Sequence, residues 1–194
     1  RDPAMINWRE MGVDIVVEST GVFTDRENAS KHFTTGAKYV IITAPAKQPD
    51  ITIVPGVNHM NLKKEHRLIS VASCTTNCLV PMLKVVNESF GVERALVTTV
   101  HAFTNDQMLH DSFHKKKRRG RAASLNLVPT STGAAEAVAE VMPELAGRVN
   151  GLAVRAPVSC GSLVDLVAEL KGEVDRDAIN AMFKRYSLTT LKGI

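Results

Sequence analysis

Cys74 is the side chain of this sequence with the clearest chemical potential. It lies between the apolar run 68–72, which predicts a buried strand, and the stretch 75–90, whose apolar spacing predicts a helix. Backbone N–H groups in the first turn of a helix have no partner inside the helix, so they favour a thiolate placed beside them. The thiolate is the nucleophilic form of cysteine. Cys74 is therefore a candidate nucleophile.

A helix end alone stabilises a thiolate too weakly, so a cationic partner is needed. Moving the ionisation of a thiol from about 8.5 to about 6 takes roughly 3.4 kcal/mol, whereas a helix terminus typically supplies about 0.3–1 kcal/mol. His101 is the best candidate, because it lies on the predicted strand that follows the cysteine's helix. A strand–helix–strand unit returns the chain beside its start, so we expect both residues at one edge of a sheet. His101 could then move protons and donate a hydrogen bond to a developing oxyanion.

Each of these residues, taken alone, also has a purely structural interpretation. A lone cysteine is more often a small buried hydrophobe, and a lone histidine at position 101 would more often belong to the core than act as a base. We apply the structural interpretation to Cys78, one turn inside the predicted helix, and to Cys160. Four further histidines are interpreted as surface residues: His59, His66, His110 and His114.

The composition is that of a globular protein. Hydrophobic residues make up 44% of the 194 residues and charged residues 23%. No apolar run approaches the roughly 20 residues that span a bilayer, and the first residues do not form a signal peptide, so we expect a cytoplasmic protein. The three cysteines predict neither a disulfide framework nor a zinc site. A net charge of +4 suits anionic small substrates as well as nucleic acid.

The first third of the chain alternates strand and helix signals. A helix should begin at the capping-box sequence Thr24–Glu27 and end near Gly36. Apolar runs predict buried strands at 14–18, 38–43, 51–54 and 68–72. Strands without alternating polarity that are joined by helices favour a largely parallel sheet with covered faces.

The remainder of the chain predicts longer elements. Helices are expected over 75–90, over 133–145, and from the cap Asp175 to about Tyr186, and strands are expected at 95–103, 151–156 and 162–168. The polar and very basic stretch 104–126 should be a long loop, and loops of that length are usually functional or disordered. We place a domain boundary at Cys74 and expect an α/β domain, 1–73, followed by an α+β domain, 74–194.

Five segments of the chain are similar to one enzyme family. Ala72-Ser-Cys-Thr-Thr-Asn-Cys-Leu79 resembles the active-site signature of phosphorylating glyceraldehyde-3-phosphate dehydrogenases. The other segments resemble family segments and occur in family order: Val16–Gly21, Thr99–Gln107, Arg118–Ala123 and Pro129–Ala135. The resemblance covers nearly the whole chain and favours the nucleophile interpretation of Cys74. It implies the second half of a Rossmann-type parallel sheet followed by part of a mixed-sheet catalytic domain.

The resemblance also implies a mechanism. Cys74 attacks the aldehyde of D-glyceraldehyde 3-phosphate, oxidation with NAD(P) leaves a thioester, and inorganic phosphate releases 1,3-bisphosphoglycerate, with His101 as base and then acid. By the same resemblance, the substrate phosphate is held by Thr104, Arg119 and Arg155, and the inorganic phosphate by Ser73, Thr75, Thr132 and Gly133. Arginine presents a planar fork to phosphate, and N–H groups at a helix start add donors.

The resemblance implies NAD as cofactor, and NADP stays open. The matching contact positions are Arg1, Thr20, Phe23 and Thr43. Their residue types alone would not indicate a cofactor site, because Ser19-Thr20-Gly21 could form a plain turn. Ser112-Phe113 stands where the family tends to have a leucine–proline pair, in a region that faces the adenosine ribose of a neighbouring subunit. The resemblance further implies a homotetramer, whereas the residue spacing and the lack of a long apolar run lead us to expect no metal ion and no membrane contact.

The chain departs from the family pattern at both ends. It lacks the Gly-x-Gly-x-x-Gly fingerprint, which the family places upstream of Arg1, and it stops before the family's last strands and terminal helix. We therefore expect a fragment, an incomplete gene prediction or part of a longer polypeptide. We do not expect these 194 residues alone to catalyse the whole reaction.

Two further functions compete with the triose-phosphate reaction. Erythrose-4-phosphate dehydrogenase uses the same cysteine without phosphate, but its members depart from the Thr104–Gln107 sequence found here. A non-catalytic binding protein would use the basic run Lys115–Arg121. For that run a solvated surface is the favoured interpretation, pairing with cofactor phosphate comes second, and nucleic-acid binding is the least favoured.

Overall fold

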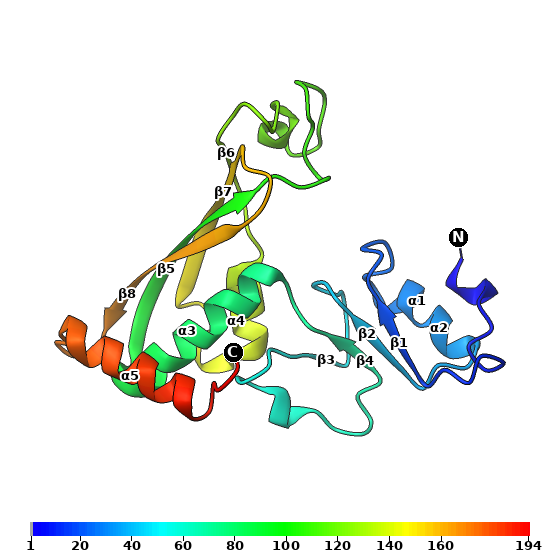
Figure 1. Cartoon of the computed structure of the whole chain (residues 1–194), viewed down its shortest axis with the longest axis horizontal. Helices are drawn as coiled ribbons and strands as arrows, with labels where there is room; N and C mark the ends of the chain where they lie inside the picture. Colours follow the sequence, from blue (N-terminus) through cyan, green and yellow to red (C-terminus); the bar gives the residue numbers. More distant parts are fainter. Residues whose placement is uncertain (1) are drawn as a thin grey trace.

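The computed structural model describes residues 2–194 and contains two four-stranded sheets (Figure 1). Arg1, one of the expected cofactor contacts, lies outside the described residues. The first sheet has the order β1-β2-β4-β3, and all of its pairs are parallel. Its strands are β1 (Ile15–Glu18), β2 (Tyr39–Ile42), β3 (Ile51–Thr52) and β4 (Leu68–Ser70). The parallel sheet expected in the first third of the chain is therefore confirmed.

The helical segment of this first part differs from the prediction in two ways. It begins one residue later than the capping box suggested, because the carboxylate of Asp25, not Thr24, accepts the hydrogen bond from the backbone N–H of Asn28 at 2.9 Å. It is also split at Ser30 into α1 (Arg26–Ala29) and α2 (Lys31–Thr34). Short 3-10 turns flank the strands: η1 (Pro3–Met5) and η2 (His59–Asn61).

One face of the first sheet is covered within the described residues, and the other face is covered only in part, because Ile69 of β4 is buried there while β1 is open. Val16 and Glu18 are buried beneath α1 and α2, whereas Ile15 and Val17 are 54% and 58% exposed. Within residues 2–194, the expectation that both faces would be covered is therefore wrong at β1. The physical reason is that the described chain places its two short helices on the same side of β1 (Figure 1).

The second sheet is mixed. It has the order β6-β7-β5-β8, with β5 and β7 parallel and both outer strands antiparallel to their neighbours. Its strands are β5 (Val92–Ala102), β6 (Val128–Thr130), β7 (Val149–Ala156) and β8 (Ser162–Leu170). The helices are α3 (Cys74–Phe90), α4 (Ala134–Val141) and α5 (Arg176–Leu188). An α/β part followed by an α+β part agrees with the expected fold class.

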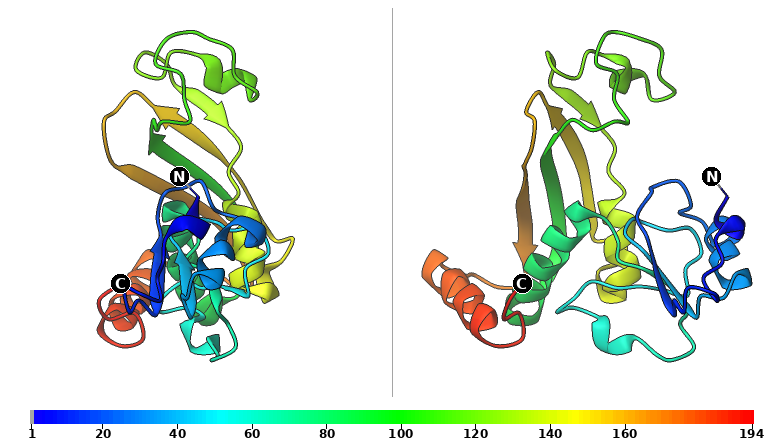
Figure 2. Two further views of the ribbon diagram at one scale, coloured as in Figure 1. Left: turned by 90° about the vertical axis from the view of Figure 1, so that its right-hand side faces the viewer. Right: turned by 45° about the vertical axis from the view of Figure 1, so that its right-hand side comes forward.

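Helices α3 and α4 pack on the second sheet and form the larger core (Figure 2). Leu79 and Leu83 of α3 are fully buried against residues of β5 and α4. Val54, which follows β3, joins the same cluster, so the core connects the two parts of the chain. No helix within residues 2–194 is long and apolar enough to cross a membrane.

The basic stretch 104–126 is a loop, as predicted, with one 3-10 turn, η3 (Lys117–Gly120). It projects beyond the ends of β5 and β7 and folds back on itself (Figure 1). The backbone N–H of Ser112 donates to the carbonyl oxygen of Gly120 at 2.9 Å, and Gly120 leaves no room for a Cβ there. Strand β6, which follows the loop, was not predicted.

The helix expected over 133–145 is shorter than predicted. It ends at Val141, because Pro143 lacks a backbone N–H and disfavours helical geometry in the residue before it. The chain continues as the 3-10 turn η4 (Pro143–Leu145).

Candidate active site

Cys74 is the first residue of α3, and a tight turn from β4 places it there. Ala72 has a φ of 58°, a left-handed conformation that a residue with a Cβ rarely adopts. Ser73 caps the helix, since its hydroxyl accepts a hydrogen bond from the backbone N–H of Thr76 at 3.1 Å. The amide of Asn77 donates to the carbonyl oxygens of Val71 at 2.8 Å and Ser73 at 2.9 Å, which holds the turn. The thiol is exposed at the helix start.

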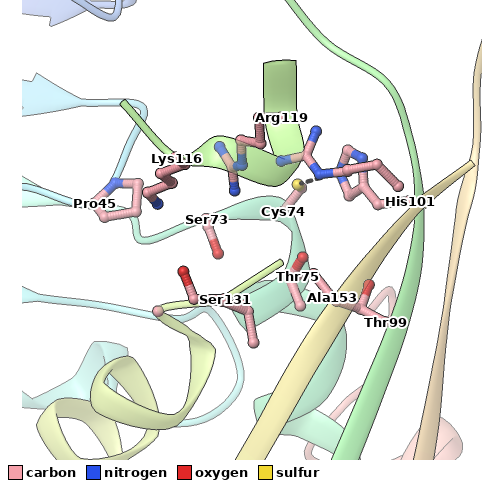
Figure 3. A pocket seen from close by; sticks show the side chains of 13 residues that line it. Pro45, Ser73, Cys74, Thr75, Thr99, His101, Lys116, Arg119, Ser131 and Ala153 are labelled. Carbon is pink, nitrogen blue, oxygen red and sulfur yellow. Dashed lines mark hydrogen bonds between the residues drawn. The ribbon is translucent and has the colours of Figure 1, made fainter. Parts of the chain in front are cut away.

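His101, near the carboxyl end of β5, lies beside the thiol. Its Nε2 is 3.4 Å from the Sγ of Cys74 (Figure 3). Its Nδ1 is 2.7 Å from the carbonyl oxygen of Ala102. A carbonyl oxygen only accepts hydrogen bonds, so Nδ1 carries a proton and Nε2 is the nitrogen that exchanges a proton with the sulfur. The pair can therefore exist as thiol and imidazole or as thiolate and imidazolium.

Arg155 on β7 brings a positive charge to the same place. Its guanidinium Nη1 donates to the hydroxyl of Thr104 at 3.0 Å, and more weakly to Ala102 and Gln107. Its Nε is buried and has no hydrogen-bond partner within residues 2–194. Burial lowers the pKa of Arg155, while the neighbouring Cys74 acts in the opposite direction. A buried donor of this kind suits an anionic ligand.

Arg119, in η3 of the long loop, is a second buried cation. Its Nη1 forms an ion pair with Asp106, and its Nε donates to the hydroxyl of Thr130 at 3.1 Å. Burial, and then the positive charge of Arg155, lower the pKa of Arg119. Two guanidinium groups that disfavour each other's charge would gain from an anion between them.

These side chains line a cavity of about 250 Å³ (Figure 3). The predicted catalytic and phosphate-binding residues all lie on its wall except Thr104, which contacts it through Arg155. The residues of that set on the wall are Ser73, Cys74, Thr75, His101, Arg119, Thr132, Gly133 and Arg155. The cavity thus combines a nucleophile, a proton carrier and cations at the carboxyl ends of β5 and β7. In such an arrangement, a phosphorylated substrate can acylate the sulfur of Cys74, and the acyl group can then be transferred from the sulfur.

Comparison with known proteins places this arrangement in a family. The sequence model of "Glyceraldehyde 3-phosphate dehydrogenase, C-terminal domain" matches residues 73–194. The chain belongs to the glyceraldehyde-3-phosphate dehydrogenase family. The resemblance noted in the five segments is therefore confirmed.

Three similar curated relatives carry the family name. Over the whole of this chain, glyceraldehyde-3-phosphate dehydrogenase of Geobacillus stearothermophilus is 57% identical and that of Streptomyces coelicolor 56% identical. Glyceraldehyde-3-phosphate dehydrogenase 1 of Bacillus subtilis is also 56% identical over the whole chain. The chain spans 58% of the length of each of these relatives.

The expected cofactor positions lie apart from the cavity wall, at the ends of the first sheet. Thr20 follows β1 and Thr43 follows β2, and both residues are exposed at the carboxyl edge of parallel strands, where such folds bind nucleotides. Phe23 is half-buried in the same loop as Thr20. Pro45, two residues after Thr43, lines the cysteine cavity. The hydroxyls of Thr20 and Thr43 both donate to Glu18, so what suits these residues to a cofactor is their exposed position on the edge that leads to Cys74.

Sequence reasoning missed one cation of the site. Lys116 lines the cavity on the side of Pro45, opposite His101 (Figure 3). It forms no ion pair with any residue in 2–194. The basic run had been interpreted mainly as solvated surface, and a lysine inside a long loop carries no spacing that would show its direction. Ser131 and Thr99 also line the cavity and were not predicted.

Three structural interpretations of single residues are wrong. Cys78 is exposed on α3. Cys160 is exposed as well, in the turn between β7 and β8. The side chain of His114 is only 8% exposed, and its Nε2 is 3.7 Å from Asp106.

No cluster of metal-binding side chains occurs in the described part of the chain.

Proposed function

We propose that this chain carries the catalytic cysteine and base of a phosphorylating glyceraldehyde-3-phosphate dehydrogenase. The substrates are D-glyceraldehyde 3-phosphate and inorganic phosphate, and the product is 1,3-bisphosphoglycerate. The observation that supports the proposal best is the 3.4 Å separation of Cys74 Sγ and His101 Nε2 inside a cavity lined by two arginines. A solvated cysteine without a function would need neither the histidine nor the cations.

The covalent chemistry takes place on the sulfur of Cys74. The thiolate attacks the aldehyde carbon, and the new alkoxide takes the proton of the His101 imidazolium to give a thiohemiacetal. Neutral His101 then removes the hydroxyl proton while a hydride leaves the same carbon, so the product is a thioester. An oxygen of inorganic phosphate attacks the thioester carbonyl, the C–S bond breaks, and the thiolate is restored beside the protonated histidine.

A nicotinamide cofactor, when bound, supplies the acceptor for the hydride. The residues of this chain that would hold it are Thr20, Phe23 and Thr43, together with Arg1. NAD is the proposed cofactor, with NADP as the alternative. This part of the proposal is supported by the exposed position of Thr20 and Thr43 at the carboxyl edge of the first sheet.

The phosphate groups are assigned to two sets of donors. Arg119, Arg155 and Thr104 would hold the substrate phosphate, and the unpartnered Nε of Arg155 supports this assignment. The inorganic phosphate is assigned to Ser73, Thr75, Thr132 and Gly133. Gly133 precedes α4, so N–H groups at the start of an eight-residue helix face the cavity wall.

The remaining proposals concern the organisation of the protein. We propose domains at 1–73 and 74–194, a homotetramer, and a glycolytic or gluconeogenic role in the cytoplasm. The exposed apolar side chains Leu152, Leu163 and Val167 on the second sheet favour an oligomer. Nucleic-acid binding through the basic run is less favoured, because Arg119 is buried and Lys116 lines the cavity, so two cations of the run belong to the cysteine site.

The test of this function is selective alkylation of the three cysteines in the 194-residue chain. Cys74, Cys78 and Cys160 are all exposed, so Cys78 and Cys160 are internal controls for access. Iodoacetamide at neutral pH should modify Cys74 at least about tenfold faster than the controls, because only Cys74 has an adjacent proton acceptor. Equal rates for the three cysteines would contradict the proposal. Peptide mass spectrometry measures the three rates in one sample.

Protection experiments distinguish the substrates. If the proposed substrate is right, D-glyceraldehyde 3-phosphate should protect Cys74 at lower concentration than erythrose 4-phosphate. An acyl phosphate should acylate Cys74 and release inorganic phosphate, which is the reverse of the proposed final step. Better protection by erythrose 4-phosphate without acylation by the acyl phosphate would favour the alternative dehydrogenase.

A further inference from the structure

A buried carboxylate, imidazole and indole form a chain in the first part of the molecule, away from the cysteine cavity. Glu18 ends β1, His32 lies in α2, and Trp8 lies in the turn before β1. The side chains of Glu18 and His32 are each only 4% exposed. Two titratable groups are therefore enclosed together, and the proposed chemistry on Cys74 uses neither of them.

The hydrogen bonds of this chain fix the proton position on His32. The indole Nε1–H of Trp8 donates to His32 Nδ1 at 3.0 Å. An indole N–H only donates, so Nδ1 must be the ring nitrogen without a proton. The proton then sits on Nε2, which lies 3.2 Å from Glu18 Oε2 and donates to it. His32 is thus a neutral ring in one tautomer, with both nitrogens in use.

The other carboxylate oxygen reaches the loop that follows β1. Glu18 Oε1 accepts a hydrogen bond from the backbone N–H of Thr20 at 2.8 Å and another from the Thr20 hydroxyl. The same hydroxyl oxygen accepts from the backbone N–H of Val22 at 3.2 Å. Burial alone would raise the pKa of Glu18, but the hydrogen bonds from Thr20 and His32 outweigh burial and lower it. The ionised carboxylate of Glu18 therefore links His32, and through it the indole of Trp8, to the loop that contains residues 20–22.

We propose that Glu18 and His32 are positioning residues, which hold the loop 19–22 in one conformation through the hydrogen-bond chain Trp8–His32–Glu18–Thr20, whose donors converge on the Glu18 carboxylate. The importance of this loop for catalysis rests on the proposed function, because Thr20 is a proposed cofactor contact. The conformation of the loop itself does not depend on that function. Every link donates toward the carboxylate, so the chain works only while position 18 is a pure acceptor.

The substitution Glu18→Gln tests the direction of the chain. A glutamine amide has one acceptor and one donor side. If its oxygen faces His32, its NH2 group meets the N–H of Thr20; if its oxygen faces Thr20, its NH2 group meets the Nε2–H of His32. A shift of the ring proton to Nδ1 would only move the conflict to Trp8. Glu18→Gln must therefore lose a hydrogen bond in every arrangement, although its size is unchanged.

The first measurement is made on the unmutated 194-residue chain and needs no variant. Long-range nitrogen–proton NMR correlation of the imidazoles should show His32 as a neutral ring protonated on Nε2 at neutral pH. Trp8 is the only tryptophan of the chain, so its indole N–H gives a single resonance, which should be shifted by hydrogen bonding and protected from exchange. A His32 ring protonated on Nδ1, or on both nitrogens, would overturn the proposal.

Variants then test the positioning role. Glu18→Gln should accelerate hydrogen exchange at the Thr20 amide or at the Trp8 indole by about tenfold or more, because one charged hydrogen bond is lost. Asp14→Asn, at an exposed carboxylate just before the same strand, should leave both rates unchanged. His32→Gln keeps an acceptor for Trp8 and a donor for Glu18, so it should preserve protection that His32→Leu abolishes. Equal effects of the two His32 variants would mean that His32 only fills space. Unchanged exchange rates in Glu18→Gln would reject the proposed hydrogen-bond chain.

This experiment is independent of the test of the proposed function. Selective alkylation of Cys74 reports on the cysteine cavity and is expected to be unaffected by Glu18→Gln. If Cys74 proves unreactive while the NMR results are as expected, the catalytic proposal fails and the positioning chain stands. If Cys74 is reactive but the NMR results differ from those expected, the hydrogen-bond chain is rejected and the proposed chemistry of Cys74 stands.

Discussion

His101 and Arg155 are register partners on the parallel strands β5 and β7. The residue proposed to move protons and the residue proposed to hold the substrate phosphate therefore sit side by side on adjacent strands, near the carboxyl ends of both. The sheet sets their separation, and α3 brings the sulfur of Cys74 to the same edge. Backbone hydrogen bonds between β5 and β7 therefore fix the relative position of His101 and Arg155.

Replacing His101 by glutamine should slow the alkylation of Cys74. A hydrogen bond to a charged group contributes roughly 1.5–3 kcal/mol, so the rate with iodoacetamide at neutral pH should fall about 10- to 100-fold. His110→Gln is the matched control, because His110 is exposed in the long loop. An alkylation rate that survives His101→Gln would mean that the helix end alone activates the thiol.

Replacing Arg155 by lysine should weaken substrate binding while keeping the positive charge. A lysine cannot reproduce the planar fork that donates to Thr104 while leaving Nε for a phosphate oxygen. The concentration of D-glyceraldehyde 3-phosphate that half-protects Cys74 should rise about tenfold or more. Arg94→Lys, in the exposed ion pair with Glu169, should leave it unchanged. If Arg155→Lys also leaves this concentration unchanged, then only the positive charge matters at position 155.

The sequence predicted the elements that follow a single strong rule. Apolar runs located every strand of the first sheet, and the apolar stripe located α3, because burial of one face dictates those patterns. Cys74 and His101 were brought together as predicted, since a strand–helix–strand unit leaves little choice of geometry. The motif around Cys74 could be recognised because its residues are neighbours in the chain.

Features that depend on tertiary contacts were not predictable in the same way. Strand β6 has three residues and contains Pro129, so it exists only because β7 offers an edge to pair with. Cys78 is a residue type that is common in protein cores, and its exposure depends on which face of α3 packs against the second sheet and α4. The chain from Trp8 to Glu18 joins residues with no common spacing. The fold of the long loop decides that Lys116 faces the cavity.

Replacing Lys116 by serine should weaken the binding of anions at the Pro45 side of the cavity. Lys116 is the cation of the long loop that lines the cavity without an ion-pair partner within residues 2–194. Acylation of Cys74 by an acyl phosphate should therefore need a severalfold higher concentration in Lys116→Ser, since an exposed charge contributes roughly 0.2–1 kcal/mol. Lys115→Ser removes a neighbouring charge that does not line the cavity. An equal loss in both variants would point to the general positive field of the loop.

Asp50 should make the stability of the first sheet depend on pH. One carboxylate oxygen accepts hydrogen bonds from the backbone N–H groups of Arg67 at 2.7 Å and Leu68 at 2.8 Å, and the other forms an ion pair with Arg26. Burial would raise the pKa of Asp50, but these contacts outweigh burial and place the pKa below its ordinary value of 3.8. The charged form is therefore the one that the folded chain prefers.

The sign of the effect follows from that lowered pKa. A carboxylate whose pKa is lower in the folded state contributes stability that is fully present above the unfolded pKa of about 3.8 and is lost as the pH falls through the folded value. Asp50→Asn should lower the free energy of unfolding by roughly 1–3 kcal/mol at neutral pH. The difference between the unmutated chain and Asp50→Asn should then shrink below about pH 4. Urea unfolding at a series of pH values measures it, and Asp14→Asn, at an exposed ion pair, should show little difference at any pH. A constant gap between the unmutated chain and Asp50→Asn down to about pH 3 would mean that hydrogen-bond geometry, and not charge, is what Asp50 contributes.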